Sequence, residues 1–128
     1  MSDFIDSNLI LRYLLDDPNA DKVERLLKGK QSLLLTDVTI SEIVWVLESF
    51  YKWDRTNIVD AVVGLLNIDI IYADKDLFLS VLKIYKTYKV DFIDAYLAGN
   101  LLRDGNGSIY SFDRDFDKIP KVIRKEPK

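Results

Sequence analysis

The stretch that decides the fold is residues 3–14, Asp-Phe-Ile-Asp-Ser-Asn-Leu-Ile-Leu-Arg-Tyr-Leu. It opens as a short strand, residues 3–5, which we expect to be buried, and continues with apolar residues at helical spacing. Asp6 stands where the strand ends and the helix begins, a position at which Asp is a good helix cap. Ser7 can cap the same helix, so the sequence leaves open whether Asp6 is a cap or a functional carboxylate.

Short strands and helices continue to alternate along the 128 residues, a length that suits one domain, residues 1–128. Strands separated by helices indicate a parallel sheet that is covered on both faces. We therefore predict an α/β fold, a three-layer α/β/α sandwich around a central, mainly parallel sheet of four to five strands. Further strands are expected at residues 32–35, 68–72, 108–112 and 119–123, and further helices at about 19–28, 39–51, 55–66, 76–88 and 91–103.

The chain contains no Cys and no His. These absences exclude disulfides, thiolate nucleophiles, His-based triads and nearly all zinc chemistry. An enzyme of this composition must rely on Asp and Glu, and carboxylate oxygens suit the hard ions Mg²⁺, Mn²⁺ and Ca²⁺. The balance of 18 Lys and Arg against 21 Asp and Glu gives a net charge of −3, which argues against nucleic-acid binding through bulk charge alone.

The start of the chain lacks the basic and apolar pattern of a signal peptide, and the apolar runs are too short to cross a bilayer. We therefore expect a cytoplasmic protein that does not associate with membranes. A reducing compartment also fits the absence of Cys.

Asp94 heads an otherwise apolar helical face. Positions 94, 97, 98 and 101 share that face and read Asp, Leu, Ala and Leu. A buried carboxylate is costly unless it has a cation, a metal ion or a shifted pKa. The alternative is a partly exposed Asp that the helix dipole favours in the first turn. Asp91, three residues earlier, can assist Asp94 or simply cap the helix.

Glu42 is expected in the first turn of the long helix that starts near residue 39, at the margin of its apolar arc, where a surface Glu is common. Asp113 follows the strand at 108–112 directly, where a site residue is expected in a parallel sheet. Asp115 and Asp117 can instead be solvated or act as local caps.

The three acids at positions 113, 115 and 117 resemble the start of an EF-hand loop. The remainder of that pattern fails, because Lys118 stands where the loop needs Gly and Arg124 where it needs Glu. We therefore exclude a calcium loop of this type.

Four acids, Asp6, Glu42, Asp94 and Asp113, are expected toward one edge of the predicted sheet. Carboxylates that converge in this way repel one another unless metal ions lie between them. Nucleases use such clusters to hold divalent ions that activate water, orient the phosphodiester and stabilise the leaving oxygen. The sequence therefore favours a metal-dependent nuclease, and this chemistry needs no His.

Four segments resemble, in order and over nearly the whole chain, the motifs of the PIN domain family. They are residues 4–14 with Asp6-Ser7-Asn8, residues 39–47 with Glu42, residues 90–98 with Asp94-Ala95, and residues 111–116 with Asp113 and Asp115. Each motif alone has little specificity, but four in the right order are fairly specific. The length and the motif set look most like the VapC-type toxins of toxin–antitoxin pairs.

This resemblance implies a Mg²⁺- or Mn²⁺-dependent ribonuclease that forms a homodimer and is inhibited by a small antitoxin. Carried over residue by residue, it implies catalytic and metal-binding roles for Asp6, Glu42, Asp94 and Asp113, with Asp115 as a further metal ligand. Asn8, Asp91 and Ser111 become accessory residues, and Ser111 replaces the Thr that is frequent in the family. Candidate RNA contacts are Arg12 and Arg114.

Other interpretations stay open. PIN domains also act in RNA processing and decay, so the chain can be a nuclease that is not a toxin. A catalytically silent PIN-like binding module is a second alternative, although no core acid is missing. An Asp-based phosphotransfer domain fits poorly, because Asn8 occupies the position where a phosphoaspartyl hydrolase needs a second Asp. The basic tail, residues 118–128, is more easily explained as solvated than as an RNA-binding patch.

Overall fold

The computed structural model describes residues 2–128, so that Met1 lies outside the described part. The chain divides into two compact units, the first ending at Lys75 and the second spanning Asp76–Lys128. The prediction that residues 1–128 form one domain stays a prediction, and each unit is described by itself. Within residues 2–128, no helix combines the length and the apolar character that crossing a membrane requires.

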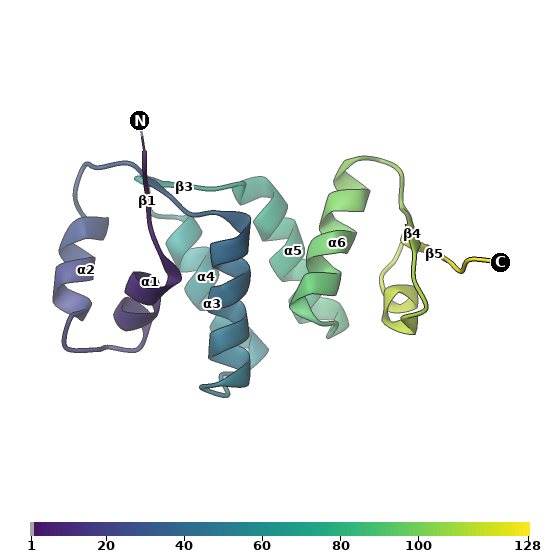
Figure 1. The fold of residues 1–128 in the computed structure, drawn as a ribbon, viewed down its shortest axis with the longest axis horizontal. Helices are drawn as coiled ribbons and strands as arrows, with labels where there is room; N and C mark the ends of the chain where they lie inside the picture. The colour runs from purple at the N-terminus through teal and green to yellow at the C-terminus, as the bar shows by residue number, and fades with distance from the viewer. Residues whose placement is uncertain (1) are drawn as a thin grey trace. The chain divides into compact units, whose positions relative to one another are not determined.

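The predicted alternation of strands and helices is present, and the α/β class is confirmed (Figure 1). The first part of the chain contains β1 (Asp3–Phe4), α1 (Ser7–Leu14), α2 (Ala20–Leu27), β2 (Leu33–Leu34), α3 (Asp37–Ser49), α4 (Arg55–Leu66) and β3 (Ile71–Tyr72). The second part contains α5 (Lys75–Tyr88), α6 (Phe92–Arg103), β4 (Ser108–Tyr110), the 3-10 helix η1 (Arg114–Lys118) and β5 (Ile123–Lys125).

All strand pairings are parallel, as predicted, but the five strands pair as two sheets. One sheet has the order β1-β2-β3, and β4 pairs with β5 in the other. The last strand begins at Ile123, whereas we expected it at residues 119–123. Ile119 is buried at the end of η1 and its carbonyl accepts a hydrogen bond from the amide of Val122 (3.3 Å), so a turn occupies the residues assigned to the strand.

In the first unit, α1 and α3 both begin where a strand of the parallel sheet ends. Buried Ile5 and Leu35 are followed by the helix caps Asp6 and Thr36. The Thr36 hydroxyl accepts a hydrogen bond from the amide of Thr39 (3.2 Å), which starts α3 at Asp37, earlier than expected. Our placement of Glu42 in the first turn is therefore wrong, since it lies in the second turn of α3.

In the second unit, stacked aromatic rings hold α5 and α6 side by side (Figure 1). Phe92, in the first turn of α6, stacks on Phe78 of α5 with ring centroids 6.3 Å apart. Tyr85, further along α5, contacts the Phe92 ring edge-on, with ring centroids 5.6 Å apart. These contacts fix the start of α6, the part of the helix that carries Asp94.

Gly99 allows α6 to approach α5 closely, since a Cβ atom at this position would lie 2.7 Å from Cγ2 of Val81. Val81 is fully buried, and its branched side chain has one preferred rotamer in a helix, so it cannot give way cheaply. Gly99→Ala is expected to lower the free energy of unfolding by about 1–2 kcal/mol, because overpacking outweighs the better helix propensity of Ala.

The matched control is Gly64→Ala in α4, where an added Cβ atom meets nothing within 4 Å. This variant is expected to raise the free energy of unfolding by about 0.5–1 kcal/mol. Urea denaturation of both variants measures the difference. Equal stability of the two variants would contradict the close approach at Gly99.

Candidate metal centre

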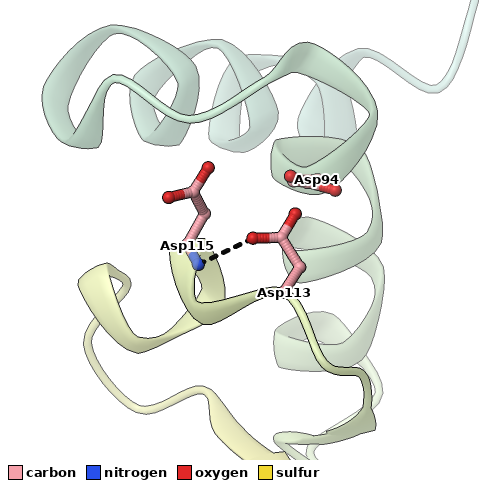
Figure 2. A group of neighbouring side chains, drawn as sticks. All are labelled: Asp94, Asp113 and Asp115. Atoms are coloured by element: carbon pink, nitrogen blue, oxygen red, sulfur yellow. Dashed lines mark hydrogen bonds between the residues drawn. The ribbon is translucent and has the colours of Figure 1, made fainter.

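Three carboxylates converge in the second unit. Asp94 lies in the first turn of α6, Asp113 is the N-cap of η1, and Asp115 lies in the first turn of η1. Each offers an oxygen, and these oxygens all lie within 4.8 Å of one another. Figure 2 shows the three side chains together, with Asp94 on α6 and with Asp113 and Asp115 at the start of η1. The structure therefore brings together three of the acids that the sequence singled out.

Local hydrogen bonds set the direction of the two acids on the η1 side. The Ser111 hydroxyl accepts a hydrogen bond from the amide of Asp113 (2.9 Å), and Oδ1 of Asp113 accepts one from the amide of Asp115 (2.9 Å, Figure 2). Buried Phe116 anchors the helix that follows. The Ser111 hydroxyl thus orients the turn that carries Asp113, and its role as an accessory residue of the site stays a prediction.

The pKa of Asp94 is raised by its surroundings in this arrangement. Its partial burial, above all, raises its pKa to about 6 from an ordinary value of 3.8, and the negative charges of Asp113, Asp91 and Asp115 add to the shift. A hydrogen bond with the Asp113 carboxyl group acts in the same direction. The ionised cluster is thus under repulsion, which a cation would relieve.

One cation already touches the cluster. The Lys118 ammonium lies 3.0 Å from Oδ1 of Asp115, three residues away in η1. We expected Lys118 in a solvated tail and did not predict this pair, although the i, i+3 spacing of an acid and a lysine indicates such a contact. A single, half-exposed ammonium cannot balance three carboxylates, so a net negative charge remains at the centre.

The residues present fit a hard divalent ion. All candidate ligand atoms are carboxylate oxygens, which Mg²⁺ and Mn²⁺ prefer. The oxygens approach one another closely. The raised pKa of Asp94 reflects its partial burial first and the negative charges of the neighbouring acids second. The geometry and the chemistry of the ligand atoms together identify a candidate metal site.

Asp91 and the apolar stripe of α6 differ in part from what we expected. Asp91 occupies the N-cap position of α6, but its side chain makes no capping hydrogen bond there. It instead adds negative potential at Asp94. The prediction that Leu97 belongs to a buried face is wrong, because its side chain is 41% exposed. The buried face of α6 is rotated toward Ala95, Ala98, Gly99 and Phe92.

Asp6 and Glu42 lie in the first unit, and their predicted roles as metal ligands stay predictions. Oδ1 of Asp6 accepts a hydrogen bond from the amide of Ser7 (2.8 Å), and Ser7 itself is a buried first residue of α1. Asp6 is therefore the N-cap of α1, in place of Ser7, while its role as a functional carboxylate stays a prediction. Both Asp6 and Glu42 are exposed.

The two residues predicted to contact RNA have different surroundings. The guanidinium of Arg12 donates to Oδ1 of Asn8 (3.2 Å) and forms an ion pair with Asp17 (3.3 Å). Arg12 and Asn8 thus have a local structural function on α1, and the predicted accessory role of Asn8 stays a prediction. Arg114 is exposed at the start of η1, beside Asp113. RNA contact by either arginine stays a prediction.

A carboxylate cluster at the start of a helix, in an α/β chain with parallel strands, is the setting that the motif resemblance implied. The chain matches the PIN domain family over residues 4–122 and belongs to this family. The predicted resemblance is thereby confirmed, and the family is consistent with the predicted α/β/α architecture. A relative is the VapC ribonuclease of Aquifex aeolicus (strain VF5), 25% identical over 121 residues, which cover 90% of each chain.

Proposed function

We propose that this protein is a metal-dependent endoribonuclease and the toxin of a type II toxin–antitoxin pair. The observation that carries the proposal is the convergence of Asp94, Asp113 and Asp115, with oxygens within 4.8 Å of one another, in a PIN domain. The similarity to a protein named VapC ribonuclease supports RNA as the substrate.

In this proposal Asp94, Asp113 and Asp115 hold Mg²⁺ or Mn²⁺. A bound ion of this kind lowers the pKa of water and neutralises charge that develops on a phosphodiester. The chain contributes the arrangement of the ligands: the amide of Asp115 fixes Asp113, and Ser111 fixes the turn before it. Burial and like charges raise the pKa of Asp94 to about 6, so Asp94 is mostly ionised at neutral pH and available to a cation.

Asp6 and Glu42 complete the proposed set of catalytic acids, on the basis of the motif resemblance. Asp6→Asn and Glu42→Gln are each expected to lower the rate of RNA cleavage by roughly 100-fold, the scale of a lost catalytic carboxylate. Asp60→Asn, which neutralises an exposed acid of α4, is the matched control and should retain cleavage.

The proposal includes partners and a compartment. The VapC-like character supports a homodimer and a small antitoxin that blocks the active site, both acting in the cytoplasm. The acidic net charge of −3 means that RNA attraction must come from bound cations and local basic residues such as Arg114, since bulk charge opposes it.

The test is RNA cleavage by the purified protein with Mg²⁺ or Mn²⁺, with and without EDTA, combined with growth of bacteria that express the protein on induction. Metal-dependent cleavage together with growth arrest is the expected result. Cleavage without growth arrest would identify an RNA-processing nuclease instead. Absence of cleavage with either metal would favour a PIN-like binding module and reject the proposal.

A further inference from the structure

Arg124 is an arginine of β5 whose side chain is enclosed by acceptors. Only 10% of it is exposed, although it lies in the segment expected to be a solvated tail. Its Nε donates to Oδ1 of Asp117 (3.1 Å), and one Nη atom donates both to the backbone carbonyl of Ser111 (3.0 Å) and to Oε2 of Glu126 (2.7 Å). The expectation of solvation is wrong for this residue.

These bonds connect Arg124 to both ends of one short segment. Ser111 stands before the acidic turn and Asp117 stands after it, within η1. Strand β5 makes a second hydrogen bond to Ser111, since the Ser111 amide donates to the carbonyl of Lys125 (3.0 Å). The segment between these two anchors contains Asp113 and Asp115, so β5 holds the turn that carries two of the three clustered carboxylates.

A series of hydrogen bonds connects Arg124 to the carboxylates of the cluster. Arg124 fixes the carbonyl of Ser111, the hydroxyl of Ser111 fixes the amide of Asp113, and the carboxylate of Asp113 fixes the amide of Asp115. Each bond restricts the orientation of the next residue. A shift of Ser111 is therefore expected to rotate the Asp113 carboxylate away from Asp94.

The chemistry of the guanidinium suits this task better than that of an ammonium. A guanidinium presents several N–H donors in a rigid plane, so it can bind acceptors on two sides at once. Its bonds to Glu126 and Asp117 raise the pKa of Arg124 further above its ordinary value, and the charge persists at any pH of interest. Hydrogen bonds between charged groups are also the stronger kind.

We propose that Arg124 is a positioning residue that holds the segment between Ser111 and Asp117 so that Asp113 and Asp115 face Asp94. Its effect on metal binding depends only on the carboxylate cluster, whereas its effect on catalysis rests on the proposed function. An RNA contact is the competing role for an arginine in this segment. The observed bonds argue against it, because the donors that reach Asp117, Ser111 and Glu126 are engaged within the chain.

The test compares Arg124→Gln, which removes the charge and the planar fork, with Arg124→Lys, which keeps the charge alone. Lys86→Gln is the control, since it removes one positive charge from an exposed position of α5. Three properties are measured: the Mn²⁺ dissociation constant by electron paramagnetic resonance, kcat and KM for RNA, and exchange of the Asp113 and Asp115 amides in metal-free protein by NMR. All measurements are made below the unfolding transition of each variant.

For Arg124→Gln we expect about a 10-fold weaker affinity for Mn²⁺ and a fall in kcat of about 10- to 100-fold, the usual range for a residue that orients metal ligands. KM should stay within about twofold, because an orienting group acts on the reaction more than on substrate binding. The two amides should exchange faster, Arg124→Lys should recover part of each property, and Lys86→Gln should match the unsubstituted protein.

Unchanged Mn²⁺ affinity and amide exchange in Arg124→Gln would overturn the proposal. A rise in KM alone would also overturn it and would assign Arg124 to RNA binding. Full recovery of all three properties by Arg124→Lys would likewise contradict positioning by the guanidinium, because the positive charge alone would then explain the effect. If the unsubstituted protein binds Mn²⁺ but cuts no RNA, the proposed function fails, while the Mn²⁺ and exchange measurements still decide the role of Arg124. If it binds no Mn²⁺, the exchange measurement decides that role.

Discussion

Replacing Asp94 by asparagine is expected to lower the rate of RNA cleavage by roughly 100-fold or more, because a metal ligand at the centre of the cluster is lost. Asparagine keeps the size of the side chain and its place in the first turn of α6, but it removes the negative charge. Initial rates with saturating Mn²⁺ measure the loss. Asp104→Asn, at the exposed end of the same helix, should retain cleavage.

The same substitution is expected to stabilise the metal-free protein above pH 6. The folded state raises the pKa of Asp94 from 3.8 to about 6, so ionising Asp94 costs free energy that the unfolded chain does not bear. Below pH 3.8 the group is protonated in both states and the penalty is absent. The penalty grows as the pH rises from 3.8 to 6 and is complete above pH 6.

Urea denaturation with EDTA at pH 3.5 and pH 7.5 tests this expectation. At the higher pH, the free energy of unfolding of Asp94→Asn should exceed that of the unsubstituted protein by on the order of 1 kcal/mol. This figure is reduced for solvent screening of a half-buried group. The difference should vanish at the lower pH. A variant that is less stable at both values would show that Asp94 has a structural role instead of being under repulsion.

Mn²⁺ is expected to raise the melting temperature of the unsubstituted protein, because the ion binds the assembled carboxylates and not the unfolded chain. At an ion concentration 100-fold above Kd the stabilisation is about 2.7 kcal/mol. For a chain of this length that unfolds in one step, this corresponds to a rise in Tm of about 10 °C. A titration of Tm against Mn²⁺ concentration, read by circular dichroism, gives the shift and the affinity.

Asp113→Asn is the informative variant for this titration. The asparagine side-chain oxygen can still accept the hydrogen bond that Asp113 receives from the amide of Asp115, so the start of η1 is preserved while the charge is removed. The variant should fold and lose most of the Mn²⁺-induced shift, and Asp104→Asn should keep it. Equal shifts in Asp113→Asn and the unsubstituted protein would place the bound ion elsewhere.

The acids of the cluster were predicted from the sequence, and the motif resemblance also singled out Ser111, but the bonds that Arg124 makes to this segment were not predicted. Asp94 was singled out because a charge headed an apolar face, and Asp113 because it followed a strand. Asp115 was the least certain of the clustered acids, since solvation explained it equally well. Its place beside Asp94 depends on how η1 packs against α6, which spacing along the chain does not encode.

The sequence by itself determined the chemistry that is available and the order of the elements. Without Cys or His the candidate site had to be made of carboxylates and hard ions. The strands and helices followed from periodicity and from caps such as Asp6, which act over a few residues. Only the tertiary structure decided which charges are enclosed. The burial of Asp94 and the three hydrogen bonds that Arg124 donates arise where separate segments meet. Sequence alone does not determine them, because the free energy of a charge depends on every group packed around it.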